Sequence, residues 1–327
     1  MLRCAVLNDY QDSALRRPQW RELDGRVEVH VFREHIADEN QLVAALADFD
    51  IVVLMRERAR ITRSLLQKSP KLKLLVTTGS RNGSVDVAAC REFGVTFCGT
   101  RNGIPAAGEL TWALILAHSR HLLVEATSLR NSGPWQQTEG QMLAGRTLGI
   151  IGLGTLGGEV ARVGLAFGMQ VQAWSANLQA SRCAELGVHG CESLDELLST
   201  SDIVTIHQVL SDRTRGLLGA RELARMRPGS LLVNTSRSAI VDERALIQAL
   251  RDGTISGAAL DVFDQEPLPP DHPFRRLPNV LATPHIGFVT AQTYDLFYGD
   301  VVEDIVGWLA GTAVREIVQQ HPAQLNR

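Results

Sequence analysis

The sequence predicts an α/β protein made of two Rossmann-like, doubly wound parallel-sheet domains with a cleft between them. Short apolar runs alternate with amphipathic runs along the chain, a pattern typical of strands and helices that follow one another in parallel sheets. One predicted strand leads directly into a glycine-rich turn and a helix. The 327 residues also exceed what one hydrophobic core usually holds, so two domains are expected.

The first hundred residues predict the first sheet. Apolar runs of strand length lie at residues 4–7, 27–32, 51–54, 72–76 and 95–97. Amphipathic stretches between them, such as 39–47 and 62–67, predict helices. One long helix is expected over 106–130, because this stretch is rich in apolar residues and Asn131-Ser132-Gly133-Pro134 follows it as a stop signal.

A second alternating series predicts the second sheet. Its expected strands are residues 147–151, 169–174, 203–206, 231–234, 256–260 and 280–282, with a helix over 155–167. The helix expected at 291–309 is placed to cross back to the first domain. We therefore expect a discontinuous substrate (catalytic) domain of residues 1–101 plus 288–327 and a dinucleotide-binding domain of residues 102–287, with hinges near 99–103 and 286–289.

Composition excludes several classes of protein. Hydrophobic residues make up 45% and charged residues 21%, and the net charge of −3 argues against a nucleic-acid or anionic-membrane partner. No apolar run approaches the ~20 residues of a membrane-spanning helix. The five cysteines are odd in number and form no Cys-x-x-Cys pair, which favours reduced thiols in the cytoplasm over disulfides or a metal site.

The glycine-rich turn predicts a dinucleotide site. Gly152, Gly154 and Gly157 form a G-x-G-x-x-G pattern between the predicted strand 147–151 and the predicted helix 155–167. The first glycine permits the tight turn, the second lets a pyrophosphate approach the backbone, and the third lets the helix pack closely on the sheet. The phosphates would lie on the helix N-terminus, at the backbone of Thr155 and Leu156.

The residues expected at the ribose end of this site do not decide between NAD and NADP. An NAD site usually has an acid at the end of the second strand, where this chain has Ser175 followed by Asn177. Both side chains can bond either a ribose hydroxyl or a 2′-phosphate. Arg182 is either a contact to that phosphate or a solvated helix residue. The cofactor is therefore NAD or NADP, and NADPH is compatible with the missing acid.

An arginine, a carboxylate and a histidine predict the reaction. Arg237, Glu266 and His285 each follow a predicted parallel strand, and the carboxyl ends of such strands form the ligand-binding edge of open α/β sheets. A guanidinium matches a carboxylate with paired donors. Histidine exchanges a proton near neutrality, and a carboxylate on its far nitrogen favours the charged ring and orients it. Each residue taken alone also fits an ordinary solvated loop.

The motifs around these residues resemble the D-isomer-specific 2-hydroxyacid dehydrogenase family over nearly the whole chain. The matching segments are residues 145–157, 227–237, 257–263 and 278–287. The resemblance implies that Arg237 binds substrate, that His285 and Glu266 form the acid/base pair, and that Asp261 contacts the nicotinamide carboxamide. It also implies a homodimer formed through the cofactor domain and the long helix. His207, Thr235 and Gly287 complete the expected cofactor contacts.

The resemblance also places substrate contacts in the first domain. The loop 77–83 corresponds to one whose amides meet the substrate carboxylate, which implies roles for Gly79, Ser80 and Arg81. Arg56 matches an arginine that meets the far end of the substrate in some members, although a solvated loop explains it equally well.

The expected function is hydride transfer between NAD(P)H and a 2-oxo acid or D-2-hydroxy acid. Two alternatives stay open. The first is a dehydrogenase of phosphorylated hydroxy acids, suggested by the arginines near the expected substrate. The second is a catalytically weak, NAD(P)-sensing protein of the corepressor kind.

Overall fold

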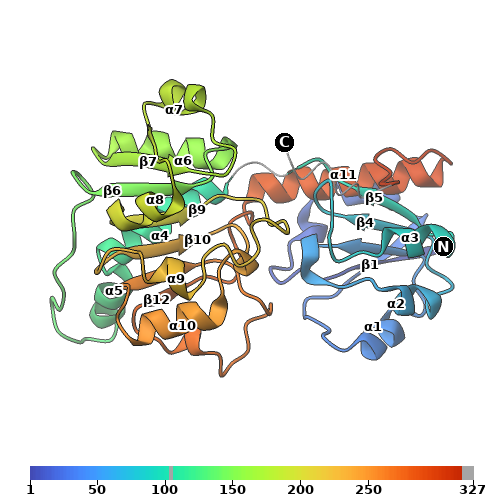
Figure 1. Cartoon of the computed structure of the whole chain (residues 1–327). Coiled ribbons are helices and arrows are strands. Elements are labelled where there is room, and N and C mark those ends of the chain that lie inside the picture. The colour runs from blue at the N-terminus through green and yellow to red at the C-terminus, as the bar shows by residue number, and fades with distance from the viewer. Residues whose placement is uncertain (103–105, 319–327) are drawn as a thin grey trace. The chain divides into compact units, whose positions relative to one another are not determined.

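The computed structural model describes residues 1–102 and 106–318. Residue 103 of the first expected hinge, and residues 319–327 of the expected first domain, lie outside the described residues. The chain divides into two compact units, one of Met1–Ile104 with Val289–Arg327 and the other of Pro105–Phe288. Figure 1 shows the red helix at the end of the chain packed on the blue-to-teal sheet of the first residues, while the green-to-orange middle forms the other sheet.

The first unit contains a five-stranded parallel sheet in the order β2-β1-β3-β4-β5. The strands are β1 (Leu2–Val6), β2 (Val27–Val31), β3 (Ile51–Leu54), β4 (Leu74–Thr77) and β5 (Thr96–Gly99). The helices are α1 (Glu39–Leu46), α2 (Arg63–Gln67), α3 (Val87–Glu92) and α11 (Ala291–Leu309), with 3-10 turns at Ala14–Arg16, Pro18–Leu23 and Arg56–Arg58. The three central strands are buried along almost their whole length, as expected of a parallel sheet covered on both faces.

Helix α11 returns the end of the chain to this first sheet. It packs on β4 and on the 3-10 helix Pro18–Leu23, where the Trp20 and Tyr298 rings lie 6.1 Å apart between centroids. Arg17 ties this region to the helix through a 3.0 Å ion pair with Asp295. The first unit is therefore built from both ends of the sequence.

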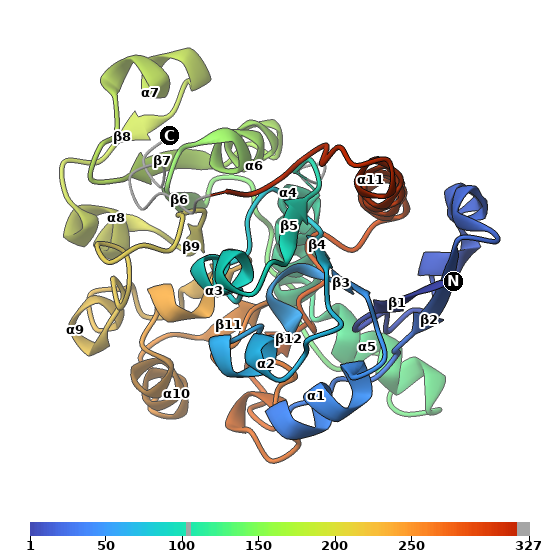
Figure 2. The ribbon, with the colours of Figure 1, turned by 90° about the vertical axis from the view of Figure 1, so that its right-hand side faces the viewer.

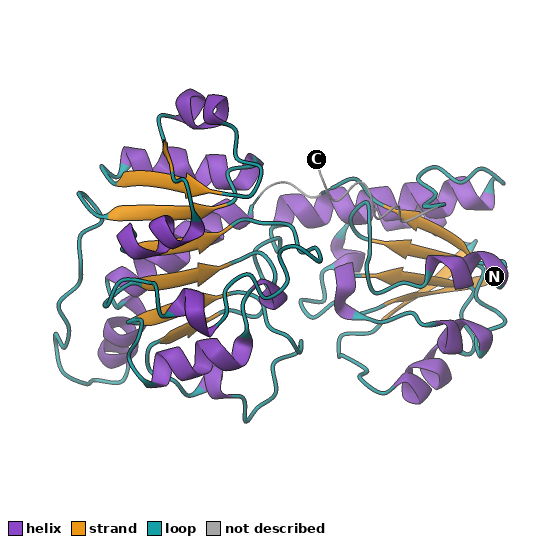
Figure 3. Cartoon of the chain, viewed as in Figure 1, coloured by secondary structure: helices purple, strands orange, loops and turns teal. Residues whose placement is uncertain are grey.

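The second unit contains a seven-stranded parallel sheet in the order β12-β11-β10-β9-β6-β7-β8. The strands are β6 (Thr147–Ile151), β7 (Gln170–Trp174), β8 (His189–Gly190), β9 (Ile203–Ile206), β10 (Leu231–Asn234), β11 (Gly257–Leu260) and β12 (Val280–Ala282). The helices are α4 (Ala107–Ser119), α5 (Leu122–Arg130), α6 (Thr155–Ala166), α7 (Ala180–Leu186), α8 (Leu194–Thr200), α9 (Ala220–Leu223) and α10 (Glu243–Arg251), with 3-10 turns at Ser238–Ile240 and Pro273–Arg275. Figure 3 shows the strands of each sheet side by side with helices around them.

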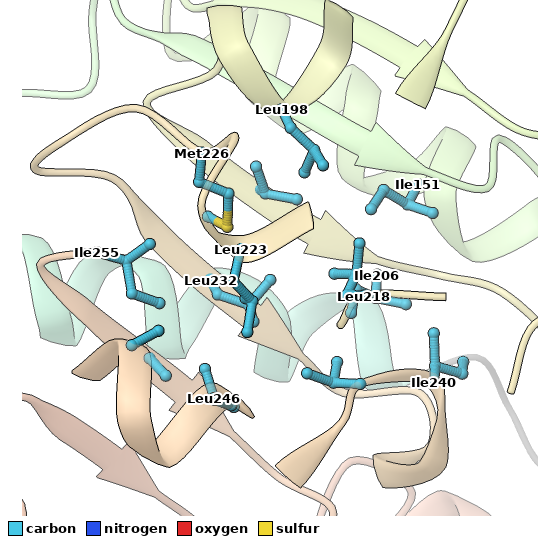
Figure 4. Close-up of a cluster of buried hydrophobic side chains, with 14 of the residues drawn as sticks. Ile151, Leu198, Ile206, Leu218, Leu223, Met226, Leu232, Ile240, Leu246 and Ile255 are labelled. Atoms are coloured by element: carbon cyan, nitrogen blue, oxygen red, sulfur yellow. The ribbon is translucent and has the colours of Figure 1, made fainter. Parts of the chain in front are cut away.

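Alternate residues of each central strand enter two separate hydrophobic cores. Ile151, Ile206 and Leu232 join the core under α8, α9 and α10, part of which is drawn in Figure 4. Their neighbours Ile150 and Val233 join the core under α4, α6 and α7. This period of two places helices on both faces of the sheet. The predicted fold class, two doubly wound parallel-sheet domains, is confirmed.

The prediction of a single long helix over 106–130 is wrong. The chain forms α4 and α5 instead, which are separated at Arg120 and His121. His121 has a φ of 50°, a left-handed conformation that histidine adopts more readily than most residues but that no α-helix accommodates. The polar run His118–His121, which interrupts the apolar stretch, marks this break. In the described part of the chain, no helix combines the length and apolarity needed to cross a membrane.

Candidate functional site

Six strands of the second sheet, β6, β7 and β9 to β12, end at the same level. Pairing aligns Asn234 with both Ile206 and Leu260, Leu260 with Ala282, and Ile206 with Ile151. The loops after these strands therefore begin along one edge. They carry the glycine turn after β6, His207 after β9, Arg237 after β10, Glu266 after β11 and His285 after β12. The carboxyl edge expected from the sequence thus exists within a single unit.

His285 and Glu266 form a direct pair on this edge. Nδ1 of His285 lies 2.7 Å from Oε2 of Glu266, and both side chains are about one-quarter to one-third exposed. The other carboxylate oxygen accepts a 3.0 Å hydrogen bond from the Phe263 amide, which orients the carboxylate. The Phe288 ring packs edge-on against the imidazole, with 5.7 Å between centroids. This arrangement leaves Nε2 as the ring nitrogen available for proton exchange.

Asp261 shapes the turn that presents His285. Its carboxylate accepts hydrogen bonds from Thr283 Oγ1 (2.6 Å), the Ile286 amide (2.8 Å) and the Gly287 amide (2.8 Å). Burial raises the pKa of Asp261, while these three hydrogen bonds act in the opposite direction. His285 itself has a left-handed φ of 51°, so the turn depends on its surroundings to hold this conformation. We therefore expect Asp261 to fix the position of the imidazole.

Arg237 stands on a short turn organised by Asn234. Asn234 Nδ2 donates to the Arg237 carbonyl (3.0 Å), and its Oδ1 accepts from the Ser236 amide (3.0 Å). The Arg237 guanidinium donates to the Ser236 carbonyl (2.8 Å) through Nη1. Ser236 Oγ in turn donates to the Ile206 carbonyl at the end of β9, which anchors the turn to the sheet edge. The arginine therefore sits, partly exposed, on a fixed backbone.

The glycine turn fits a dinucleotide. A Cβ on Gly154 would meet no atom within 4 Å, whereas one on Gly157 would collide with the Gly152 carbonyl of the turn. Gly154 is the N-cap of α6 and provides no side-chain cap, so the first amides of the helix are left for another acceptor. Space and uncapped amides at one helix N-terminus suit a pyrophosphate. Thr155 and Leu156 supply the next amides.

The residues expected at the ribose end lie just after β7. Ser175 is half-buried directly after the last strand residue, and Asn177 is exposed. Arg182 is not a freely solvated side chain, because it donates to the Leu153 carbonyl (3.4 Å) and pairs with Glu185 (2.8 Å). Its guanidinium also lies against Gly158 at the start of α6. A fixed positive charge therefore stands close to the glycine turn.

His207 and Thr235 flank the same edge. His207 Nε2 lies 3.0 Å from Thr205 Oγ1, and burial lowers the pKa of this histidine to about 4. His207 is thus neutral at physiological pH and unsuited to holding a proton for catalysis. The Thr235 hydroxyl is 2.8 Å from that of Thr111 in α4, which links the β10 turn to the helix below it.

The expected substrate residues lie together at the carboxyl edge of the first sheet. Leu54, Thr77 and Gly99 are aligned by pairing, and Arg56 follows the first of them while Gly79 and Ser80 follow the second. The Arg56 guanidinium lies directly against Gly79 and occupies the space of a side chain there, and the φ of +89° at Gly79 also disfavours any residue but glycine. Ser80 donates to Asn102 (2.7 Å), and Arg81 is exposed.

The structure therefore groups the predicted residues into two sets. Arg237, Glu266, His285 and the cofactor residues share the edge of the second unit. Arg56, Gly79, Ser80 and Arg81 share the edge of the first unit. Sequence reasoning missed the supporting roles of Asn234, Thr283 and Phe288. Asn234 could have been found, because asparagine directly after a strand commonly organises a turn through its own amide.

Comparison with known proteins agrees with this geometry. Residues 112–287 match the family model described as D-isomer specific 2-hydroxyacid dehydrogenase, NAD binding domain. A glyoxylate reductase from Aeropyrum pernix is 37% identical over 278 residues, which cover 82% of each chain. A phosphoglycerate oxidoreductase from Vibrio cholerae has a TM-score of 0.91 and 37% identity, covering 95% of this chain and 100% of that one.

The chain belongs to the D-isomer specific 2-hydroxyacid dehydrogenase family. The family predicted from the sequence motifs is therefore confirmed, and with it the class of NAD-dependent oxidoreductase acting on 2-hydroxy acids. The family also contains longer proteins. A D-3-phosphoglycerate dehydrogenase from Methanocaldococcus jannaschii is 33% identical over 283 residues, 86% of this chain but 53% of that protein. The chain thus spans about half the length of this relative.

Proposed function

We propose that this protein reduces small 2-oxo acids to D-2-hydroxy acids, with His285 and Glu266 as the acid/base pair and Arg237 as the substrate-binding residue. The observation that supports these roles best is the 2.7 Å contact between His285 and Glu266, on the same sheet edge as Arg237 and the glycine turn. His285 donates its Nε2 proton to the oxygen that forms as the carbonyl is reduced. Glu266 stabilises the imidazolium and fixes the ring.

Arg237 is proposed to hold the carboxylate of the substrate and to polarise its carbonyl. A guanidinium provides paired, permanently charged donors for this purpose. Bound NAD supplies or accepts the hydride. The chain contributes the amides of Gly154, Thr155, Leu156 and Gly157 for the pyrophosphate, and we assign Asp261 and Gly287 to the nicotinamide end, beside the turn that carries His285.

We further propose that NADP is accepted besides NAD. Ser175 leaves no carboxylate to repel a 2′-phosphate, and the guanidinium of Arg182 is held near the glycine turn. Dissociation constants for NADH and NADPH, measured for the wild type and for Ser175→Asp, test this point. The variant should lose NADPH affinity selectively. Equal losses for both cofactors would contradict a 2′-phosphate site at Ser175.

The first unit is proposed to provide the substrate domain and the second the dinucleotide domain. The Arg56 guanidinium lies against Gly79, which has a left-handed φ, and so brings a positive charge to a glycine turn, an arrangement suited to an anion. This observation also favours a second candidate substrate class, phosphorylated hydroxy acids, to which the phosphoglycerate-acting relatives point.

A substrate panel separates the two candidates. Steady-state rates with glyoxylate, hydroxypyruvate and phosphohydroxypyruvate should show turnover that depends on His285 in every case. A kcat/KM highest for the phosphorylated acid, and reduced by Arg56→Ala, would select the second class. Tight cofactor binding without turnover of any 2-oxo acid would instead favour a cofactor-sensing binding protein.

A homodimer is proposed through α5 and the segment that follows it. Apolar side chains stand exposed there, namely Leu122, Leu123, Val124, Leu129, Trp135 and Met142, of which Trp135 and Met142 are each 79% exposed. Several exposed apolar side chains within one segment favour an interface there. The mass in solution, measured by light scattering, should halve in Leu123→Asp. A wild-type monomer would exclude the dimer.

The five cysteines, all free and buried, support the further proposal of a cytoplasmic location.

A further inference from the structure

Three metal-ligating side chains meet at the outer edge of the larger sheet. His189 lies in β8, Cys191 follows that strand directly, and Glu196 lies in the first turn of α8. One ligand atom from each lies within 4.8 Å of the other two. Figure 2 shows β8 beside β7, with α8 close to both. None of the roles proposed above uses these residues.

Local structure holds the three side chains in this arrangement. His189 and Cys191 are two residues apart on an extended segment, so their side chains point to the same side. The Cys191 amide donates to the Ala173 carbonyl (2.9 Å), which fixes the cysteine beside β7. Ser193 caps α8 by accepting from the Glu196 amide (3.1 Å), and this cap sets the position of the first helical turn.

The Glu196 carboxylate is oriented as a ligand would be. Its Oε2 accepts a 2.7 Å hydrogen bond from the Glu192 amide, and its Oε1 lies 3.6 Å from His189 Nε2. Outer hydrogen bonds of this kind orient metal-binding carboxylates in proteins. An exposed histidine–glutamate ion pair contributes little by itself. Cys191 beside it is buried and packs at the border of the hydrophobic core under α8.

The set of donor atoms selects the metal. An imidazole nitrogen, a thiolate and a carboxylate oxygen are the ligands of zinc, at bond lengths of ~2.0–2.3 Å in a tetrahedron. Such a tetrahedron separates its ligand atoms by about 3.5 Å, close to the 3.6 Å between His189 and Glu196. Thiolate and carboxylate together neutralise the charge of a divalent ion. Magnesium and calcium prefer sites made of oxygen alone.

We propose that His189, Cys191 and Glu196 form a binding site for one zinc ion, with water as the fourth ligand. Binding releases the thiol proton of Cys191 to solvent and forms the zinc–sulfur bond. The zinc would tie the end of β8 to the start of α8, and the Cys191 amide bonds to Ala173 of β7, two residues before Ser175 at the proposed ribose site. This proposal is independent of the dehydrogenase reaction.

Zinc binding to the full chain tests the proposal. Protein kept reduced with a phosphine and stripped with a chelator is titrated with zinc against a chromophoric chelator. The wild type should bind one zinc per chain and gain thermal stability. His189→Ala and Cys191→Ser should each weaken binding by more than the ~10–100-fold lost with an outer-shell partner. His189 is two-thirds exposed, so its removal does not threaten folding.

Two further measurements make the result specific. Glu192→Gln removes a neighbouring charge without removing a ligand atom, and it should bind zinc as the wild type does. Cobalt in place of zinc should show a sulfur-to-metal charge-transfer band that disappears in Cys191→Ser. Absence of stoichiometric zinc binding by the wild type overturns the site. So does zinc binding that persists at full affinity in both His189→Ala and Cys191→Ser.

Discussion

His285 Nδ1 lies 2.7 Å from Glu266 Oε2, and the second oxygen of that carboxylate is held by the Phe263 amide. The Glu266 carboxylate is therefore oriented by the backbone of its own loop, while Asp261 holds the turn that presents His285. Because one ring nitrogen is committed to Glu266, proton exchange with a substrate must pass through the other.

His285→Ala should lower kcat by about 10²–10⁴-fold, because it removes the proposed proton donor. Affinity for NADH should stay within a few-fold of the wild type, since the glycine turn is untouched. Oxidation of NADH followed by absorbance gives the first quantity and fluorescence titration the second. His272→Ala is a matched control, because His272 also pairs with a carboxylate, Glu243 at 3.1 Å, and is assigned no role in the reaction. Normal turnover in His285→Ala would refute the assigned role.

Glu266→Gln should reduce kcat by about 10- to 100-fold, the loss expected when a hydrogen bond to a charged group becomes a neutral one. The amide keeps the shape of the side chain and its contact with the Phe263 amide. KM for the 2-oxo acid should change little, because Arg237 provides substrate binding. A large rise in KM at unchanged kcat would show that Glu266 acts on binding instead.

Asp261→Asn should destabilise the protein by about 1–3 kcal/mol and lower kcat, since one amide oxygen replaces two carboxylate oxygens that accept three hydrogen bonds. At least one donor of the His285 turn then loses its partner. Urea unfolding measures the first effect and steady-state kinetics the second. Asp264→Asn, an exposed neighbour, is the control and should change neither. Unaltered stability in Asp261→Asn would contradict the positioning role.

Gly154→Ala should fold normally and bind NADH at least ~10-fold more weakly, because its Cβ meets no protein atom but occupies the space proposed for the pyrophosphate. Gly157→Ala should instead destabilise the protein, because its Cβ collides with the Gly152 carbonyl. Thermal melts without cofactor separate the two effects. Gly299→Ala, which also meets no atom within 4 Å, is the control and should leave NADH affinity intact.

The free energy of unfolding should decrease at acidic pH, because buried His207 resists protonation in the folded protein. Its pKa is about 4 in the folded protein against an ordinary value of 6.5, so between these pH values the unfolded chain binds a proton that the folded chain does not. The stabilisation is complete above pH 6.5 and is lost as the pH falls towards 4. At pH 5 the loss is up to ~2 kcal/mol. Urea unfolding at pH 7.5 and pH 5 should show a smaller difference in His207→Gln than in the wild type.

Much of this architecture could be predicted because its signals are local. Continuous apolar strands such as β9 and β10, and a glycine turn between a strand and a helix, each reveal their structure within a few residues. The two-residue β8 is too short to give a periodic signal, and its pairing with β7 depends on long-range contacts. The break at His121, where φ is left-handed, coincides with the polar run His118–His121, but the apolar residues on both sides favoured one continuous helix.

The sequence predicted which residues form the candidate site, but it could not predict the contacts between them. Arg237, Glu266 and His285 could be assigned to one sheet edge because each follows the carboxyl end of a predicted parallel strand. The three bonds of Asp261, and the Asn234 turn beneath Arg237, arise only when separate loops are folded together. The cluster of His189, Cys191 and Glu196 has no recognisable spacing, because a strand end and a helix start bring it together.

The common level at which β6, β9, β10, β11 and β12 end bears on how such a protein diversifies. Each loop that starts at this level is attached to its own strand of the sheet. Insertions or exchanges in one of them can change which acid is accepted without disturbing the hydrophobic layers beneath. A common scaffold can in this way serve many metabolic tasks through variation confined to its rim.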